Sequence, residues 1–501
     1  MEFIFMILSS LLFTIPNYFP ALFFLSWFAF IPLIYLIKDY DYSHSFIIAV
    51  LVGFLNSTFS FYWLYQPLNS TLKMPFSFNI FILFLFFLFS ALPLGVWVLI
   101  NKFLQPQNSY SPFTAALSWS VLEYLRFEFL NLNPFNYFAY SQSSFNFIAR
   151  YAAYGGMFLV SFISVLIASY LVKLFLEPKW KKGVPLAVFL IILAIIPIFI
   201  GPQSDVELKQ LKFDLLINNS QAKSSTFEEI ENEIDNFASL LGKKKNKYIL
   251  TAEDSLSFDL IRNSYYREKL FSQIKAELNG SYLQLGSHAA AAANYNARIL
   301  NSLFLLSENL EVINRSNQEL NFLAGINLKN KEKIIDFFEG YLRFNQGMIK
   351  KSKSTEIIEI NELKFINLIA EEIFIPVISR KNNYAGNINL IINAAAEEKI
   401  NSKVYNNLAL AAAVYRAAES NTALIRAVSG GYSAAIDYQG KILVKEKLKN
   451  DLKSFNLTLY QGESYYQKNP TKIINIILII FTVIAFVKIM IKLRKNLSSR
   501  N

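Results

Sequence analysis

The sequence predicts a bundle of about eight membrane-spanning helices joined to an α/β domain. Three observations favour this fold class. Hydrophobic residues make up 53% of the 501 residues and aromatic residues 16%, which is more than soluble domains carry. The apolar residues concentrate in the first two hundred and the last thirty positions, and the periodicity changes between Val206 and Tyr466. We therefore expect a seven-span bundle at 1–203, a soluble domain at 206–466 and a last membrane helix at 471–493.

The predicted spans are apolar runs that approach the roughly 20 helical residues needed to cross a bilayer. The first run is short and lacks both a basic leader and a small-residue cleavage site, so we interpret it as a helix and not as a signal peptide. The spans are Phe3–Pro16, Phe19–Ile37, Phe46–Tyr65, Phe76–Ile100, Ala115–Leu130, Ala152–Phe175, Val184–Ile200 and Ile473–Ile491.

Charge and residue usage restrict the function classes. The net charge is +11, but Lys and Arg are scattered or lie beside the apolar spans, so the pattern does not indicate nucleic-acid binding. Lys38, Lys102 and Lys492 fall on one side of the membrane if both chain ends are cytoplasmic, which places the domain outside the cytoplasm. The chain has no Cys and two His, so it predicts no disulfide, no metal cluster and no cofactor.

Two features of the membrane part are candidates for function. Glu123 and Arg126 are three residues apart on one predicted helix, so they are placed to pair with each other. The alternative is a helix end whose charges reach the lipid headgroups. The aromatic and polar loop Asn131–Ser144 suits the membrane interface and is a candidate lipid entry. The double glycine Gly155–Gly156 predicts a close contact between helices.

The middle of the chain alternates predicted strands and helices, which is typical of an α/β domain. Buried strands are expected at Leu211–Ser220, Asn246–Ser255, Tyr282–Ser287, Ile299–Ser307 and Ile388–Ala396, and amphipathic or long helices at Phe227–Leu241 and Asn406–Asn421. The strand at Asn246–Ser255 ends in the acidic stretch TAEDS. Taken alone, an acid at a strand end such as Glu253 is more often a solvated or capping residue than a general base, so its role depends on further evidence.

The stretch KFINLIAEEIFIPVISR (Lys364–Arg380) predicts a buried strand that enters a tight elbow. Such an elbow holds one side chain at the tip of a rigid element, where a nucleophile is well preorganised. The tip residue here is Ala370, which has no nucleophilic atom, and two carboxylates, Glu371 and Glu372, follow it. We expect these acids to be a structural pair, with one of them buried against backbone amides.

The order of these elements resembles the apolipoprotein N-acyltransferase family of bacterial envelopes. The resemblance rests on NPFNYFAYSQ (Asn133–Gln142), on TAEDS, on the elbow, and above all on the uninterrupted stretch RAAESNTALIRAVSGGYSAAIDYQGKIL (Arg416–Leu443). It implies a nitrilase-like (CN-hydrolase) α-β-β-α sandwich on an eight-helix bundle. It also implies a multi-pass protein of the bacterial inner membrane, with the domain on the periplasmic side.

The resemblance further implies an acyltransferase that works through a Glu-Lys-Cys triad and a thioester. Its partners would be a phospholipid as acyl donor and the diacylglyceryl-Cys of a lipoprotein as acceptor. The chain itself would be a monomer. Residue by residue, Glu253 matches the general base, Ala370 stands at the nucleophile position, and Glu372 matches the supporting acid. Arg315, or Asn317 after a two-residue shift, stands at the Lys position. The nucleophile is therefore missing.

Three functions follow from this pattern. The first is the acyltransferase itself, and the second is a catalytically inactive relative that binds phospholipid or lipoprotein. A transporter is disfavoured, because the spans carry few charges and show no inverted repeat. Ser255 and Ser433 are alternative nucleophiles, but the sequence places no His to activate either one. The absence of a thiol at residue 370 favours the inactive relative.

Overall fold

The computed structural model describes residues 2–72, 75–105, 110–130, 133–178, 181, 183–199, 206–218, 226–290, 299–318, 322–323, 326–327, 356–376, 388–398 and 400–498. The first two residues of the loop Asn131–Ser144 and positions 377–380 of the elbow stretch lie outside these ranges. The chain divides into two compact units. One comprises residues 1–65, 74–202 and 464–501, and the other comprises 66–73 and 203–463.

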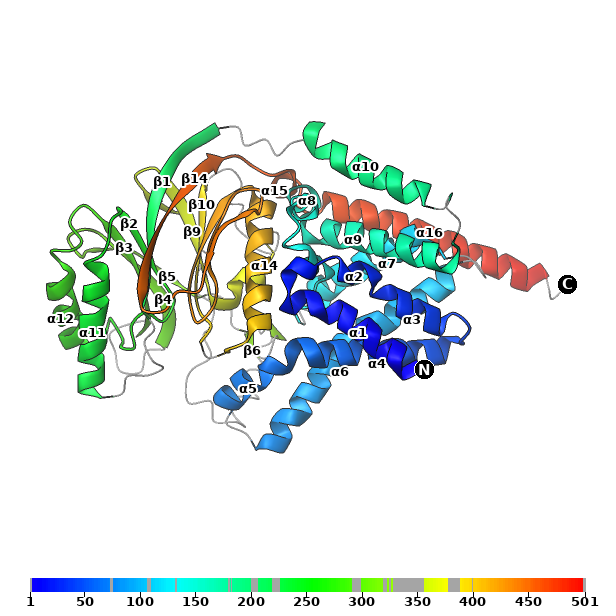
Figure 1. The fold of residues 1–501 in the computed structure, drawn as a ribbon, viewed down its shortest axis with the longest axis horizontal. Coiled ribbons are helices and arrows are strands. Elements are labelled where there is room, and N and C mark those ends of the chain that lie inside the picture. The colour runs from blue at the N-terminus through cyan, green and yellow to red at the C-terminus, as the bar shows by residue number, and fades with distance from the viewer. Residues whose placement is uncertain are drawn as a thin grey trace. The chain divides into compact units, whose positions relative to one another are not determined.

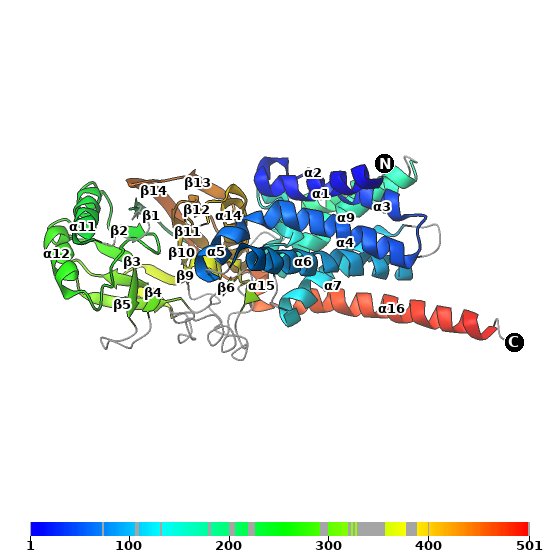
Figure 2. The same ribbon diagram turned by 90° about the horizontal axis from the view of Figure 1, so that it is seen from below.

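The first unit is helical, and Figures 1 and 2 show its helices running side by side as a bundle. Its helices are α1 (Glu2–Tyr18), α2 (Leu25–Phe28), α3 (Phe30–Ile37), α4 (Tyr42–Phe61), α6 (Phe76–Leu104), α7 (Pro112–Leu125), α8 (Asn146–Ala149), α9 (Ala152–Leu176), α10 (Val184–Phe199), α15 (Tyr465–Lys468) and α16 (Lys472–Ser498). The short helix α5 (Tyr65–Leu72) joins α4 to the segment before α6.

Four helical segments of the described chain are long and apolar enough to cross a membrane. They are Tyr42–Asn69, Phe76–Leu104, Ala152–Leu176 and Lys472–Arg494. Three shorter apolar helices are found at Glu2–Tyr18, Leu25–Ile37 and Val184–Ile196. The structure therefore supports a multi-pass membrane protein, and the predicted number of eight spans stays a prediction.

Small residues let the helices of this unit approach closely. A Cβ atom at Gly53 of α4 would lie 2.9 Å from the Cα of Ala91 on α6, so only glycine permits this contact. The predicted close contact at Gly155–Gly156 is also present. Gly156 has φ +67°, which breaks the helical geometry of α9, and a Cβ there would meet the ring of Tyr466 at 2.6 Å.

The second unit contains two six-stranded sheets. The first sheet has the order β14-β1-β2-β3-β4-β5 and the second has the order β13-β12-β11-β10-β9-β8. The strands are β1 (Val206–Ile217), β2 (Tyr248–Thr251), β3 (Tyr282–Ala290), β4 (Ile299–Leu306), β5 (Val312–Asn317), β8 (Ile358–Ile360), β9 (Leu363–Ile369), β10 (Leu390–Ala396), β11 (Ala423–Ser429), β12 (Ser433–Ile436), β13 (Ile442–Glu446) and β14 (Asp451–Gln461). Two short strands, β6 (Phe322–Leu323) and β7 (Ile326–Asn327), pair separately.

Each sheet buries one face against the other sheet and the opposite face against helices (Figure 1). Alternate residues such as Phe213 and Leu215 on β1 and Phe365 on β9 share the core between the sheets. The other face of the first sheet packs on α11 (Phe227–Leu241) and α12 (Ser264–Ile274) through residues such as Phe237. Helix α14 (Lys403–Ser420) contacts β11 and β12 of the second sheet. The unit is thus an α-β-β-α sandwich, as expected.

Candidate functional site

The elbow after β9 is formed as the sequence predicts. Strand β9 ends at Ile369, and a 3₁₀ turn runs from Ala370 to Phe374. Ala370 has φ +52°, in the left-handed region that costs an L-residue about 1–2 kcal/mol. Its side chain is 8% exposed and clusters with Leu303, Ile369 and Ala394. The chain therefore keeps a strained turn of the kind that presents a nucleophile, but it presents a methyl group.

Glu372 closes this turn. Its Oε2 accepts a hydrogen bond from the backbone N–H of Ile369 at 2.8 Å, and the residue is 2% exposed. Glu371, by contrast, is only half-buried. Glu372 is thus the member of the acid pair that is buried against a backbone amide. A charged acceptor at this position stabilises the turn in which Ala370 adopts its positive φ.

Glu253 follows the end of β2, and its carboxylate accepts hydrogen bonds from residues of β4 and β10. Its Oε1 accepts from the side-chain amide of Asn301 at 2.5 Å, and its Oε2 accepts from the backbone N–H of Ala396 at 3.2 Å. Glu253 is 6% exposed. A carboxylate this deeply buried needs such donors, because desolvation of an unpaired charge is costly.

The partners of Glu253 bring it to the same edge of the sandwich as Ala370. Asn301 lies two residues before Leu303 on β4, and Ala396 lies two residues after Ala394 on β10. Leu303 and Ala394 both belong to the small apolar cluster around Ala370. Because residues two apart on a strand share a face, Glu253 and Ala370 converge between the two sheets.

Arg315 and Asn317 lie on the other face of the first sheet. Arg315 pairs with Phe304 in the ladder of β4 and β5, and its guanidinium lies 5.1 Å from the Phe304 ring, which packs under α11 and α12. It donates to the backbone carbonyls of Ala290 at 2.9 Å and Ala289 at 3.1 Å, and burial lowers its pKa. Asn317 accepts a hydrogen bond from Ser302 at 2.7 Å on the same face.

The site-facing neighbours of these two residues are Ser316 and Gln318. Ser316 pairs with Leu303 in the ladder, and its hydroxyl accepts from the side chain of Asn367 on β9 at 2.9 Å. Gln318 accepts from Asn301 at 2.9 Å, the same amide that binds Glu253. On the side of β5, the polar group near Glu253 is therefore the neutral amide of Gln318, which is hydrogen-bonded to Asn301. The expected role of Arg315 or Asn317 at the Lys position stays a prediction.

A second layer of polar side chains supports the elbow from the α14 side. Asn393 donates to the carbonyl oxygens of Leu368 at 2.9 Å and Ala370 at 3.4 Å. Its own Oδ1 accepts from Nε of the fully buried Arg426, which also bonds to the carboxylate of Glu397. These bonds connect β9, β10 and β11 directly behind the elbow.

Tyr405 of α14 is fully buried near this layer and near Glu253. Burial raises its pKa well above the ordinary value, and the neighbouring carboxylates of Glu371, Glu397 and Glu253 raise it further. Arg426 acts in the opposite direction. These surroundings favour the neutral phenol of Tyr405, which is a hydrogen-bond donor.

The structure also answers the question of alternative nucleophiles. The hydroxyl of Ser255 donates to the carbonyl of Ala252 at 2.9 Å and is fully buried. That of Ser433 bonds to both the N–H and the carbonyl of Val428. Both hydroxyls therefore bind their own local backbone, as turn residues do.

A histidine that the sequence reasoning did not place lies beside this edge. The Nε2 of His288 is 2.7 Å from Oδ1 of Asp254, the residue after Glu253. In the ladder of β3 and β4, His288 is the direct partner of Asn301. Only the strand register reveals this neighbourhood, because Asp254 and His288 lie 34 positions apart in the sequence.

The site thus combines two carboxylates, neutral amides and a phenol around a position that lacks a nucleophile. In the part of the chain that the structure describes, no group of three or more His, Asp or Glu side chains is arranged to hold a metal ion. The arrangement can accept and donate hydrogen bonds. It has no atom at Ala370 that can attack a carbonyl carbon.

The comparison with known families finds a match within the first unit. Residues 9–170 match the model described as the apolipoprotein N-acyltransferase N-terminal domain. This region of the chain is similar to that N-terminal domain, and the match covers less than half of the chain. It runs from α1 into α9 and includes Glu123, Arg126 and the loop at 133–144. No curated protein matches the chain.

Solved structures with some likeness each cover about half of the chain. A CN-hydrolase superfamily protein from Xanthomonas campestris with an arsenic adduct in its active site has 11% identity, with a TM-score of 0.36 over 54% of this chain and 97% of that one. A mutant amidase from Nesterenkonia sp. AN1, with the acetamide moiety of fluoroacetamide on its active-site cysteine, has 11% identity and a TM-score of 0.36 over 52% and 93%. A double mutant of that amidase in complex with acrylamide has 12% identity and a TM-score of 0.35, over 52% of this chain and 94% of that one.

Proposed function

We propose that this chain is a membrane-bound, lipid-binding relative of the apolipoprotein N-acyltransferases that does not transfer acyl groups through a thioester. Its partners would be a phospholipid and a diacylated lipoprotein. It would reside in the bacterial inner membrane as a monomer with eight spans and with the sandwich on the periplasmic side. The observation that carries the proposal is Ala370, which occupies the tip of a formed elbow in a chain without Cys.

The chemistry requires an atom that Ala370 lacks. In thioester chemistry a thiolate attacks the ester carbonyl of the donor, and the lysophospholipid leaves as its alkoxide takes up a proton. The amine of the acceptor then attacks the thioester, and the thiolate leaves. A methyl group can neither donate an electron pair to the carbonyl carbon nor depart from it. Glu253 alone, with its carboxylate held by Asn301 and Ala396, supplies at most a base.

The polar side chains around the elbow are still in place, which favours a folded site that binds a ligand. The elbow keeps its positive φ at residue 370, and Glu372, Asn393 and Arg426 still hold the turn. Removal of a covalent nucleophile can leave the binding and oxyanion contributions of a site in place. We therefore expect this chain to bind lipid even though it does not transfer acyl groups.

The acyltransferase alternative is tested with the purified full chain, a phospholipid donor and a diacylated lipopeptide acceptor. Mass spectrometry of the lipopeptide measures N-acylation, and the intact mass of the protein reveals an acyl adduct. We expect neither product from the unaltered chain, while co-purified phospholipid is retained. The matched variant Ala370→Cys restores a thiol beside Glu253, and an acyl adduct is expected in this variant alone.

Two results would reject the proposal. Steady N-acylation by the unaltered chain would show that another group acts as the nucleophile. An acyl adduct on Ser255 or Ser433 would identify that group. Failure of the delipidated chain to take up any phospholipid would reject the lipid-binding half.

A further inference from the structure

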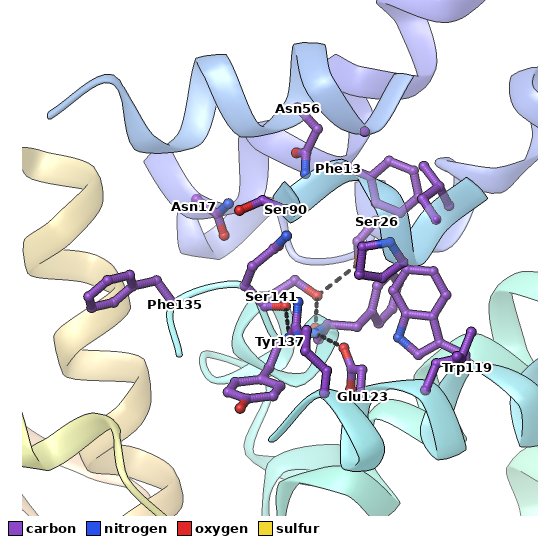
Figure 3. Close-up of a pocket in the computed structure, with 17 residues that line it drawn as sticks. Phe13, Asn17, Ser26, Asn56, Ser90, Trp119, Glu123, Phe135, Tyr137 and Ser141 are labelled. Atoms are coloured by element: carbon purple, nitrogen blue, oxygen red, sulfur yellow. Dashed lines mark hydrogen bonds between the residues drawn. The ribbon is translucent and has the colours of Figure 1, made fainter. Parts of the chain in front are cut away.

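The membrane unit encloses a cavity of about 70 Å³, and its charged side chains bind the backbone beside them (Figure 3). Glu123 accepts a hydrogen bond from the N–H of Phe138 at 2.7 Å. Arg126 donates to the carbonyl of Asn136 at 2.6 Å. Both side chains follow the general rule that buried polar groups are hydrogen-bonded.

Two buried oxygen atoms of the sandwich depart from this rule. Oε2 of Glu397 and Oδ1 of Asn406 have no hydrogen-bond partner in the part of the chain that the structure describes. The two residues are 1% and 4% exposed. A buried acceptor without a donor is costly, and a charged one costs more than a neutral one. The two atoms therefore require an occupant that the chain itself does not supply.

Both atoms lie against the turn at Gly430 and Gly431, which joins β11 to β12. Nδ2 of Asn406 donates to the carbonyl of Gly430 at 3.3 Å, so Oδ1 of the same amide is beside this turn. A Cβ atom on Gly431 would lie 1.9 Å from Oε2 of Glu397, so the carboxylate also reaches the turn. Two acceptors thus border one turn, and no described donor serves either of them.

The surroundings carry an excess of negative charge. Tyr405 on α14 is within electrostatic reach of three carboxylates and one guanidinium. The carboxylates are those of Glu371, Glu397 and Glu253, and the guanidinium is that of Arg426. Three negative charges therefore face one positive charge in a buried region. Such an excess attracts a cation, because charges interact strongly where water is excluded.

Arg426 does not provide the missing donor. Its Nε donates to Asn393 at 3.0 Å, and its Nη1 donates to the carbonyl of Tyr432 at 3.2 Å. Its Nη2 binds Oε1 of Glu397. All three nitrogens of the guanidinium are thus engaged, while the second carboxylate oxygen of Glu397 is left over.

We propose that the turn at Gly430 and Gly431 is the binding site of a small monovalent cation, K⁺ or ammonium, held by Oε2 of Glu397 and Oδ1 of Asn406. Oxygen dipoles of this kind replace the hydration shell of K⁺, whereas the softer metals prefer nitrogen or sulfur. A divalent ion would meet a stronger repulsion from the guanidinium of Arg426, which binds the same carboxylate. The site involves no lipid, so it stands or fails independently of the proposed function.

The cation stabilises the elbow from behind. It neutralises Glu397, which binds Arg426. Arg426 donates to Asn393, and Asn393 donates to the carbonyl of Ala370 at 3.4 Å. A ligand that binds only the folded state lowers the population of the open state by mass action. At ten times its dissociation constant, the ion should lower that population about tenfold.

The experiment measures hydrogen exchange of peptides from β10 to β12 in the purified full chain. The salts are the chlorides of K⁺, ammonium and the bulky cation N-methylglucamine, at one pH and one ionic strength. We expect exchange to slow about tenfold in K⁺ or ammonium and not in N-methylglucamine. A larger effect of ammonium identifies an occupant that donates N–H bonds, and a larger effect of K⁺ identifies a bare ion. Equal exchange in all three salts would overturn the proposal, because water or a bound proton would then match the two acceptors.

Three variants locate the effect. Asn406→Leu removes Oδ1 and should abolish the slowing by K⁺. Asn406→Asp keeps acceptor oxygens at this position and adds a negative charge, so it should enlarge the slowing. Asn456→Leu, at an exposed position of β14, is the matched control and should leave the slowing unchanged. If Asn406→Leu does not fold, Asn406→Asp decides, since an effect of K⁺ no larger than in the unaltered chain would refute the site.

Discussion

Nε of Arg426 donates a hydrogen bond to Oδ1 of Asn393 at 3.0 Å, and both side chains are fully buried. The same guanidinium bonds to Glu397, and Asn393 reaches the carbonyl of Ala370. The charged guanidinium of Arg426 on β11 is in this way connected to the elbow through the side-chain amide of Asn393. The elbow therefore depends on a buried ion pair that lies behind it.

The first prediction concerns this ion pair. Arg426→Met leaves the buried carboxylate of Glu397 without its partner and should destabilise the sandwich by about 3–5 kcal/mol. Hydrogen exchange of peptides from β9 to β11, measured by mass spectrometry on the full chain, reports the loss. Lys453→Met breaks an ion pair with Glu446 whose two side chains are 48% and 43% exposed, and it should cost less than about 1 kcal/mol. Equal protection in the two variants would contradict the argument.

The second prediction concerns the backbone of Ala370. Ala370→Gly removes the strain of a left-handed backbone conformation, which is about 1–2 kcal/mol for an L-residue. This gain offsets the roughly 0.5–1 kcal/mol by which glycine destabilises a fold, because glycine gives the unfolded chain more conformational freedom. The net change should be close to zero or stabilising. Ala394→Gly is the matched control, because Ala394 packs in the same cluster from a regular strand and should lose about 1 kcal/mol. Hydrogen exchange at the elbow distinguishes the two variants. A greater loss of protection in Ala370→Gly than in Ala394→Gly would refute the argument that the backbone of Ala370 is strained.

The third prediction concerns Gly286 of β3. A Cβ there would lie 2.0 Å from the carbonyl oxygen of Ala252 and 2.1 Å from that of Glu253. Gly286→Ala must therefore move the segment that carries the Glu253 carboxylate, at a cost of about 1–3 kcal/mol. Gly242→Ala, where the nearest atom is 3.6 Å away, should be neutral or slightly stabilising. Protease sensitivity of the two purified variants checks this order, and an unaffected Gly286→Ala would contradict it.

The fourth prediction concerns topology. If both ends of the chain are cytoplasmic, a reporter inserted after residue 300 should behave as extracytoplasmic and one fused after residue 501 as cytoplasmic. The reason is the bias of Lys and Arg beside the spans, as at Lys38 and Lys102. A pair of reporters, one active only outside the cytoplasm and one active only inside, makes the measurement. The reverse result at either point would refute this topology.

Much of the fold follows from periodicity in the sequence. The predicted strands at Leu211–Ser220, Tyr282–Ser287 and Ile388–Ala396 correspond to β1, β3 and β10, and the predicted helix Phe227–Leu241 has the bounds of α11. These segments bury continuous or strictly periodic apolar faces, which local sequence specifies. The number of spans stays a prediction, because short apolar helices such as α1 and α10 have the composition of a membrane span without the length of a full crossing.

The chemistry at residue 370 was determined by the sequence itself: a chain without Cys forms no thioester, whatever its fold. Arg315 and Asn317 are two residues apart, so the sequence also implied that they share a face of one strand. Only the tertiary structure decided which face, since the ladder that pairs Arg315 with Phe304 turns both away from Glu253. The partners of Glu253, Asn301 and the N–H of Ala396, likewise come from strands distant in sequence, so their meeting depends on strand register, which local sequence does not encode.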